Sequence, residues 1–121
     1  MGVKTTKMVI ENYQFGSITI DGEVHQSDVI IYPDKIDAKW WRKEGHSLVP
    51  EDIVEVIKRK PAVLIVGCGA TGCLKISEET AEYIKDKGIK LIAQNTAEAV
   101  QTYNQFAKKN QRVIAALHLT C

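Results

Sequence analysis

The sequence predicts an α/β domain of three layers, in which a mixed, mainly parallel sheet follows an N-terminal antiparallel hairpin or meander. One observation behind this prediction is a pair of β-branched runs that flank Asp21-Gly22 in the N-terminal half. The other is a change of periodicity at Pro50, after which amphipathic helical stretches alternate with short apolar runs. Strands and helices that alternate over short connections form parallel sheets with right-handed crossovers. Residues 1–121 are expected to form this one domain.

The N-terminal strands are expected at residues 17–20 and 23–32. The Asp21-Gly22 pair between them suits a type I′ turn, which needs positive φ at both central residues. Pro33 is expected to end the second strand, and residues 35–41 are expected to supply a shorter third strand. This part of the chain therefore predicts antiparallel pairing.

Three helices are expected in the rest of the chain, and each has a local boundary signal. The first begins with Pro50 as its first residue and stops before Pro61. The second begins after Ser77 as the N-cap and ends at Gly88, since glycine tolerates the left-handed conformation that often follows a helix. Thr96 is expected to cap the third helix.

Three buried strands are expected between and after these helices. Residues 62–67, 89–94 and 112–119 are short and largely apolar runs, as is typical of strands that are covered on both faces. The carboxyl ends of parallel strands meet at one edge of a sheet, where α/β proteins usually bind their ligands. Functional residues are therefore sought where these runs end.

The composition is that of an ordinary globular protein, and it excludes several kinds of partner. Sixteen basic residues face fifteen acidic ones, so the net charge of +1 gives no reason to expect nucleic acid. The longest apolar run, residues 62–66, is too short to cross a bilayer, and no membrane partner is expected. The N-terminal residues lack the apolar stretch of a secretory signal, and an odd number of cysteines argues against a secreted disulfide framework. We expect a cytoplasmic protein.

A glycine loop, defined as residues 67–72, follows the first buried run. Gly67, Gly69 and Gly72 spell G-x-G-x-x-G, the pattern of a dinucleotide-binding turn. That turn needs a helix at the third glycine and an acidic residue after the next strand, whereas here the next N-cap is Ser77 and the strand ends in Gln94-Asn95. The favoured interpretation is a tight connection out of the strand. A nest of backbone N–H groups for a small anion stays open as an alternative.

Cysteines and a histidine are expected near the same edge. If the first and third buried strands are neighbours, Cys68, Cys73, His118 and Cys121 converge and form a Cys3His set that suits zinc. Cysteine is more often a small buried apolar residue, so we predict no metal. His118 beside Cys68 or Cys121 would be the corresponding catalytic pair.

The segment with two adjacent tryptophans is the other unusual stretch. Trp40 and Trp41 beside Arg42 and His46 are able to form a ligand wall or a protein-binding hot spot. The simpler interpretation is that one tryptophan closes the hairpin onto the core while the charged residues are solvated. His25 alternates outward on its strand and is expected at the surface.

Together these segments resemble a family of small proteins with no established reaction. It includes archaeal and bacterial single-domain members, the animal adipogenesis-associated domain-containing protein and a mitochondrial assembly factor for respiratory complex I. The matching segments are FGSITIDGEVHQSDVIIYP, WWRKEGH, PEDIVEVI, LIVGCGATGCLKI, TAEYIKDKGI, TAEAVQTYN and RVIAALHLTC.

The resemblance implies a three-layer α/β fold and neither an established reaction nor a cofactor. It adds weight to Trp41-Arg42, the glycine loop, Thr96 and residues 118–121, which fall on family-like motifs. Cys68 and Cys73 do not look like family features, which weakens the zinc interpretation. The sequence has no arginine- and serine-rich presequence of the mitochondrial type, so assembly or scaffolding is only what the resemblance implies.

The favoured functional hypothesis is a non-enzymatic binding or assembly-factor-like module. The alternative is a small-molecule- or anion-binding protein, or an enzyme, that uses the glycine loop and residues 118–121. The expected partner is another protein or, in the alternative, a small anionic ligand. The chain is expected to be a monomer or a weak homo-oligomer, and no catalytic residue or cofactor is assigned. The candidate ligand-binding residues are Gly67, Gly69, Gly72, Thr96, His118, Thr120, Cys121, Arg42 and Trp41.

Overall fold

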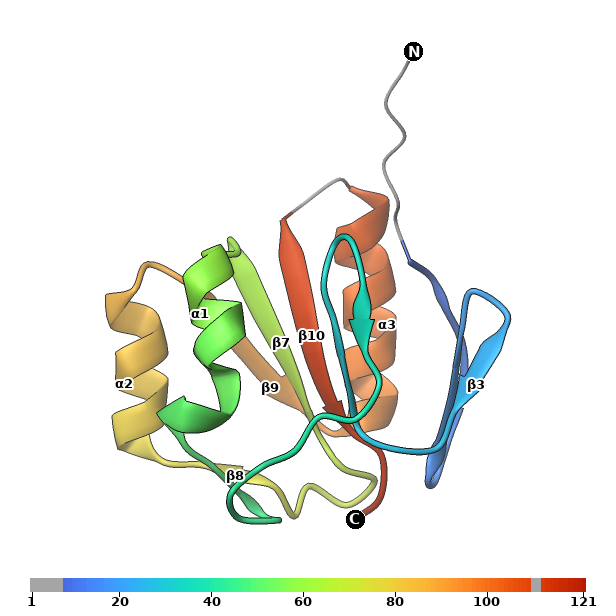
Figure 1. Ribbon diagram of the computed structural model, residues 1–121, viewed down its shortest axis with the longest axis horizontal. Helices are drawn as coiled ribbons and strands as arrows, with labels where there is room; N and C mark the ends of the chain where they lie inside the picture. Colours follow the sequence, from blue (N-terminus) through green and yellow to red (C-terminus); the bar gives the residue numbers. More distant parts are fainter. Residues whose placement is uncertain (1–7, 110–111) are drawn as a thin grey trace.

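A five-stranded sheet forms the middle of the computed structural model, which describes residues 8–109 and 112–121 (Figure 1). Its strands are, in spatial order, β5 (Ile36–Asp37), β4 (Val29–Ile31), β10 (Val113–His118), β7 (Val63–Cys68) and β9 (Lys90–Gln94). The ladders of β10 with β7 and of β7 with β9 are parallel, whereas β4 pairs antiparallel with both β10 and β5. The predicted mixed α/β fold is confirmed.

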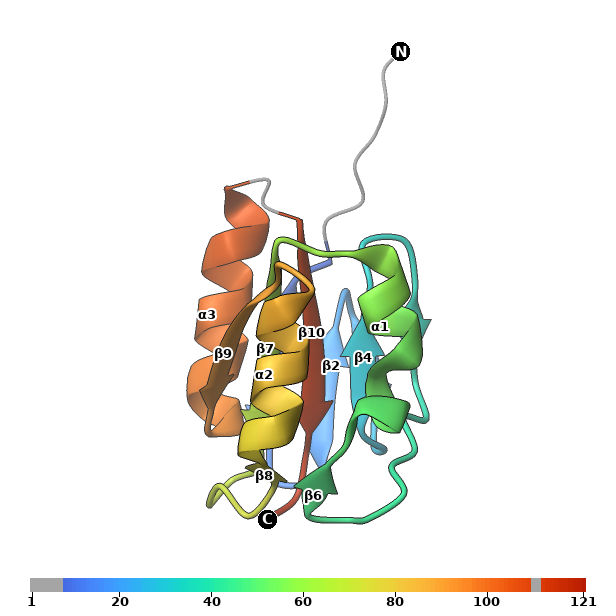
Figure 2. The same cartoon turned by 90° about the vertical axis from the view of Figure 1, so that its left-hand side faces the viewer.

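Each face of this sheet is covered by a different layer (Figures 1 and 2). One face packs on η1 (Pro50–Ile53), α1 (Val54–Arg59) and α2 (Glu78–Asp86). The other packs on α3 (Thr96–Lys108) and on a separate antiparallel sheet of β1 (Ile10–Gln14), β2 (Ser17–Ile20) and β3 (Glu23–His25). A short parallel pair, β6 (Ser47–Leu48) and β8 (Lys75–Ile76), completes the fold.

Side-chain alternation along the central strands divides the core between these layers. In β7, Val63 and Ile65 belong to the cluster beneath α3, whereas Leu64 and Val66 belong to the cluster beneath α1 and α2. Because successive side chains of a strand point to opposite faces, a strand covered on both sides must be apolar throughout. β7 and β10 are buried along their whole length, as predicted.

The N-terminal hairpin forms as predicted, but its second strand does not continue. Asp21 and Gly22 have φ values of 49° and 84°, which agrees with a type I′ turn. The prediction of one strand over residues 23–32 is wrong, because the chain leaves the outer sheet after β3 and enters the central sheet at β4. The polar residues 26–28 make this crossing between two layers, which a single straight strand cannot span.

Helix boundaries follow the local signals with one exception. Pro50 opens η1, the Ser77 hydroxyl accepts from Thr80 N at 3.1 Å, and Gly88 lies just after α2 with a φ of 80°. The prediction of Thr96 as a cap is wrong, since Asn95 is the N-cap and Thr96 is the first residue of α3. The Thr96 hydroxyl instead donates to the carbonyl of His118 and does not cap the N-terminus of the helix.

Two burial predictions are also wrong. β9 is the edge strand of the central sheet, so Lys90 and Ala93 are exposed and the strand is not covered on both faces. His25 was expected at the surface, but its side chain is only 11% exposed. It lies opposite the fully buried Ile18 in the β2–β3 ladder, and residues directly opposite each other share one face of a sheet.

No helix among the described residues is both long enough and apolar enough to cross a membrane.

Candidate functional site

Most of the candidate residues gather at one end of the central sheet, called the carboxyl edge. It is the end at which β7 and β10 finish, near the C mark of Figure 1. His118 lies opposite Cys68 in the β10–β7 ladder. On its other side β10 pairs with β4, where Leu117 lies opposite Val29. One step further along this antiparallel register, His118 meets Asp28.

Asp28 is the centre of a buried hydrogen-bond network. Its Oδ2 lies 2.8 Å from His118 Nδ1 and accepts from Arg42 Nη1, also at 2.8 Å. Its Oδ1 accepts from Leu119 N at 2.8 Å. The side chains of Arg42, His118 and Asp28 are 6%, 7% and 18% exposed. Asp28 therefore ties two other segments, the one around Arg42 and residues 118–119, to its own.

The electrostatic balance keeps this carboxylate charged. Burial by itself would raise the pKa of Asp28. Hydrogen bonds from His118, from the Leu119 N–H and from Arg42 outweigh burial, so the pKa of Asp28 lies below its ordinary value of 3.8. Asp28 is thus ionised around neutral pH, and its charge balances that of Arg42 inside the protein.

The proton positions on His118 follow from its partners. Nδ1 lies 2.8 Å from Asp28 Oδ2 and 3.1 Å from Arg42 Nη2. A guanidinium only donates and a carboxylate only accepts, so Nδ1 bonds one of the two at a time. Arg42 Nη2 already donates to Gly45 O at 2.9 Å, and the shorter contact assigns an Nδ1–H that donates to Asp28. Nε2 then faces the Thr120 hydroxyl at 3.5 Å.

The two tryptophans have opposite environments. Trp40 is buried, and its indole N–H donates to Asp52 O at 3.0 Å. The Arg42 guanidinium lies 4.7 Å from the Trp40 ring centroid, a cation–π contact. Trp41 is 75% exposed. Trp40 therefore packs into the core as the simpler interpretation expected, but Arg42 is buried with it and is not solvated.

The glycine loop lets the 118–121 segment lie directly against it. Gly69 has a φ of 103°, and a Cβ there would collide with the Cys121 carbonyl. A Cβ on Gly67 would lie 2.9 Å from Thr96 Oγ1. Gly72 has a φ of 76°, and a Cβ there would lie 2.8 Å from the Asn95 side chain. Glycine is therefore required at each position, either because a neighbouring atom leaves no room for a Cβ or because the backbone is left-handed.

Backbone N–H groups of the glycine loop are engaged within the chain. Gly69 N donates to Thr96 Oγ1 at 2.8 Å, and Ala70 N donates to Thr120 O at 2.7 Å. Just beyond the loop, Cys73 N donates to Cys121 O at 2.9 Å. An anion nest needs such donors to point together at a ligand. Here they hold the 118–121 segment and the first turn of α3.

The opposite side of the 118–121 segment is tied to the outer sheet. Leu119 O accepts from Gly16 N and from the Tyr13 hydroxyl, both at 2.9 Å. The β1–β2 turn is thereby brought to the carboxyl edge. Its Phe15 is 65% exposed, a feature that sequence reasoning missed.

The cysteines are not arranged as a metal site. Cys68 is buried among the side chains beneath α1 and α2, and burial raises the pKa of its thiol. Cys73 and Cys121 are half-buried, and all three thiols are free. Cys121 Sγ lies 3.7 Å from His46 Nε2. Within residues 8–109 and 112–121, no three His, Cys, Asp or Glu side chains are grouped so that they could hold a metal ion.

Comparison with known proteins places the chain in a family. A sequence model for the family described as "Protein of unknown function (DUF498/DUF598)" matches residues 10–118. The chain belongs to this family. The resemblance is confirmed as far as this family of unknown function, whereas the likeness to the adipogenesis-associated protein and to the complex I assembly factor stays a prediction.

Solved structures of similar proteins show the same fold as this DUF498/DUF598 chain. The conserved hypothetical protein PH1505 from Pyrococcus horikoshii OT3 is 29% identical, with 93% of this chain and 98% of that chain covered and a TM-score of 0.78. The protein MT938 is 26% identical over 94% and 99% of the two chains, with a TM-score of 0.79. An outer membrane protein from Bartonella henselae, 24% identical over 95% and 97%, has a TM-score of 0.81 and shows the fold alone.

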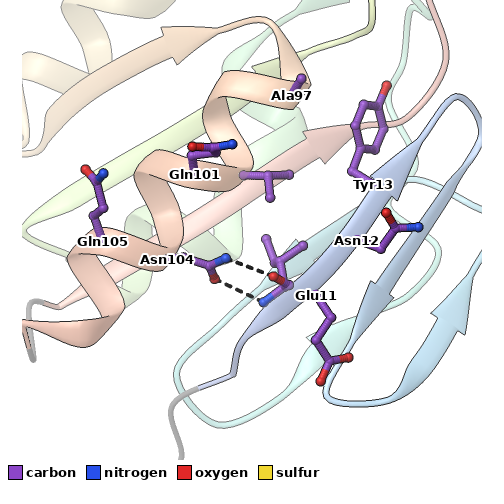
Figure 3. Close-up of a pocket in the computed structure, with 9 residues that line it drawn as sticks. Glu11, Asn12, Tyr13, Ala97, Gln101, Asn104 and Gln105 are labelled. Atoms are coloured by element: carbon purple, nitrogen blue, oxygen red, sulfur yellow. Dashed lines mark hydrogen bonds between the residues drawn. The ribbon is translucent and has the colours of Figure 1, made fainter.

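A cavity of about 480 Å³ lies between β1 and α3 (Figure 3). Its walls carry amide side chains, among them Gln101 and Asn104. The Asn104 amide accepts from Ile10 N at 3.0 Å and donates to Ile10 O at 2.8 Å. It thus makes the two backbone hydrogen bonds that a neighbouring strand would otherwise make with β1 at this residue. None of the candidate ligand-binding residues lines this cavity.

Asp28 is the main site residue that sequence reasoning missed in this family member. It lies within residues 23–32, which were interpreted as one strand. A signal was present, because the polar stretch 26–28 interrupts the apolar alternation immediately before the wholly buried β4. An acidic residue just before a buried strand needs a hydrogen-bond partner, and His118 at the end of β10 is that partner.

Proposed function

We propose that this chain is a non-catalytic binding module whose contact surface is the carboxyl edge around Trp41 and Phe15. The observation that supports it is that these are the most exposed large apolar side chains among the described residues, at 75% and 65%. The segment of Trp41 is held at this edge by the bond from Arg42 to Asp28, and the segment of Phe15 by the bond from Gly16 N to Leu119 O. Exposed aromatic side chains on a firm base are typical of the anchors of protein interfaces.

The buried network gives this surface its firmness. Arg42, next to Trp41, is held by Asp28 and by Gly45 O. Gly16, next to Phe15, donates its N–H to Leu119 O. A surface ordered before binding loses less conformational entropy when a partner docks. Asp28 and His118 thus serve as positioning residues for the anchors.

Another protein is the proposed partner. The resemblance to an assembly factor supports this choice, and so does the near-neutral charge of the chain, which gives no basis for recognising nucleic acid. The engaged N–H groups of the glycine loop count against the small anionic ligand of the alternative hypothesis.

Site-specific photo-crosslinking in the source cells tests the binding module. A photoreactive residue at position 41 is expected to give one discrete adduct, whereas the same residue at position 54 is not. Val54 is a matched control because it is an exposed apolar side chain, 49% exposed, on α1. The purified partner is expected to bind Trp41→Ala and Phe15→Ala about tenfold more weakly, as interface anchors do, and Val54→Ala unchanged. Equal adducts at positions 41 and 54 would overturn the proposal.

Catalysis at the same edge is the second candidate function, and one observation favours it. Asp28, His118 and Thr120 form the order carboxylate, imidazole, hydroxyl, with contacts of 2.8 Å and 3.5 Å. An imidazole oriented by a carboxylate activates a hydroxyl in nucleophilic enzymes. The contact to the hydroxyl is long, and Arg42 shares the carboxylate. If the protein turns over a substrate, and this activity is lost in Thr120→Ala but kept in Trp41→Ala, the enzyme hypothesis replaces the binding-module hypothesis.

A further inference from the structure

Two half-buried thiols belong to neighbouring segments of the carboxyl edge. Cys73 follows the glycine loop, and Cys121 lies in the 118–121 segment. Cys73 N donates to Cys121 O at 2.9 Å, and Ala70 N donates to Thr120 O at 2.7 Å. These two hydrogen bonds align the segments.

The backbone spacing at this pair suits a disulfide. Antiparallel residues that exchange backbone hydrogen bonds have Cα atoms about 5.5 Å apart, and the bond from Cys73 N to Cys121 O brings these two backbones together in a comparable way. Disulfides form between Cα atoms about 4.4–6.8 Å apart. The Thr71 hydroxyl lies between the two residues, 3.4 Å from Cys73 Sγ and 3.3 Å from Cys121 O. A bond requires the Cys73 thiol to leave Thr71 and the Cys121 thiol to leave His46, so that the two sulfurs meet.

The two thiols have different neighbours, which assigns them different roles. Cys121 Sγ lies 3.7 Å from His46 Nε2, and this nitrogen accepts the thiol proton in the tautomer that carries its hydrogen on Nδ1. The thiolate is the nucleophilic form of cysteine. Cys73 Sγ contacts the Thr71 hydroxyl, which is no base. Cys68 is buried in the core beneath α1 and α2 and is not available to an oxidant in solution.

We propose that Cys121 and Cys73 form a reversible disulfide when the protein meets a peroxide, with Cys121 as the attacking thiol and Cys73 as the resolving thiol. This inference goes beyond the proposed function, since it needs no partner protein. Disulfides that form and break in this way act as redox sensors.

The chemistry balances in two steps. The Cys121 thiolate attacks one peroxide oxygen, so an S–O bond forms, the O–O bond breaks, and the other oxygen leaves as water after taking up a proton. Cys73 then attacks the sulfenic sulfur, the S–S bond forms, the S–O bond breaks, and a second water leaves. The two thiols lose two electrons and two protons, and hydrogen peroxide is reduced to two waters.

Oxidation would change the carboxyl edge in two ways. It ties the 118–121 segment covalently to the chain that follows the glycine loop. It also removes the thiol from His46, whose ring lies 5.8 Å from the His118 ring in an edge contact.

Intact-mass and peptide analysis of the full chain treated with hydrogen peroxide tests the proposal. The expected product is a monomer lighter by two hydrogen atoms, with the peptides of Cys73 and Cys121 joined and released again by dithiothreitol. Cys68→Ser is the matched control and is expected to form the same bond. Cys73→Ser and Cys121→Ser are expected to form none, although serine keeps the size of the side chain and circular dichroism is expected to report folded protein.

The order of attack is tested by trapping the sulfenic acid with dimedone. The expected adduct is on Cys121 in Cys73→Ser, with little or none on Cys73 in Cys121→Ser. Three outcomes would overturn the proposal. They are a bond that includes Cys68, a bond only between two copies of the chain, and a folded wild type in which Cys121 oxidises to the sulfinic acid without a disulfide.

Discussion

Two arginines of this chain make nearly the same contacts in different surroundings. Arg42 pairs with Asp28 at 2.8 Å, and Arg59 pairs with Asp34 at 2.7 Å. Each guanidinium also lies 4.7 Å from the centroid of an aromatic ring. The side chains of the first pair are 6% and 18% exposed, whereas those of the second are 27% and 67% exposed. Access of water is thus the main difference.

That difference decides what each pair does for the molecule. Water screens the exposed pair and offers both charges other partners, so such pairs stabilise proteins little. In the buried pair, the carboxylate also accepts from His118 and from the Leu119 N–H, and no solvent replaces a lost partner. The geometry of an ion pair alone therefore does not reveal its importance. Only the buried pair joins the β4, β10 and Trp41 segments into the carboxyl edge.

Removing the buried carboxylate is expected to have the largest effect. Asp28→Ala leaves the Arg42 charge buried without a counter-ion and the Leu119 N–H without its acceptor. Breaking one side of a buried pair lowers the free energy of unfolding by about 3–5 kcal/mol. Urea unfolding followed by circular dichroism measures this loss.

Asp34→Ala is the matched control for that experiment. It removes the same kind of contact from Arg59, but at an exposed position, and Arg59 keeps its bond to Glu55 at 3.0 Å. Its unfolding curve is expected to match that of the wild type within error. Equal losses for the two variants would show that burial does not distinguish the pairs.

The glycine loop offers a second comparison, between a crowded and an open glycine. Gly69→Ala brings a Cβ against the Cys121 carbonyl at a φ of 103°, so the 118–121 segment must move. At Gly88, with a φ of 80°, a Cβ meets nothing within 4 Å. A left-handed alanine alone costs about 1–2 kcal/mol. Gly88→Ala is expected to lose that amount of unfolding free energy and Gly69→Ala clearly more, as measured by urea unfolding. Equal losses would mean that the contact with Cys121 is unimportant.

Local signals were sufficient for much of the fold. The Asp21-Gly22 turn, the Ser77 cap and the apolar run of β7 each carry their structure within a few neighbouring residues. The break after β3 was missed because the partner of Asp28 is His118, ninety positions away along the chain. The edge position of β9 was missed because the apolar pattern of one strand does not show where that strand lies in the sheet.

The candidate site could be predicted in part for the same reason. His118, Thr96 and the glycine loop end up at one edge because parallel strands bring their carboxyl ends together. Whether the loop faces a ligand or another part of the chain depends on the path of residues 118–121, which no local pattern reveals. Phe15 was missed because a turn residue reaches this edge only through the bond of Gly16 to Leu119.

The smallest of the expected effects is a pH dependence of the unfolding free energy, which also distinguishes the Arg42–Asp28 pair from the Arg59–Asp34 pair. The pKa of Asp28 is lowered in the folded protein, chiefly by hydrogen bonds from His118, Leu119 N–H and Arg42 that outweigh its burial. A lowered folded pKa contributes stability that is present above the ordinary value of 3.8 and is lost as the pH falls through the folded pKa. The difference in unfolding free energy between wild type and Asp28→Asn should therefore be constant near neutral pH and shrink below about pH 4.

Urea unfolding of both proteins at several pH values measures this difference. Asp34→Asn is the control, because the pKa of Asp34 is also lowered, by Arg59, but at an exposed position where water weakens the effect. Its difference from the wild type is expected to stay small at every pH. In strong acid, protonated Asp28 and asparagine are both uncharged. If the wild type kept its full advantage in unfolding free energy there, the stabilisation would not come from the ionised Asp28 carboxylate.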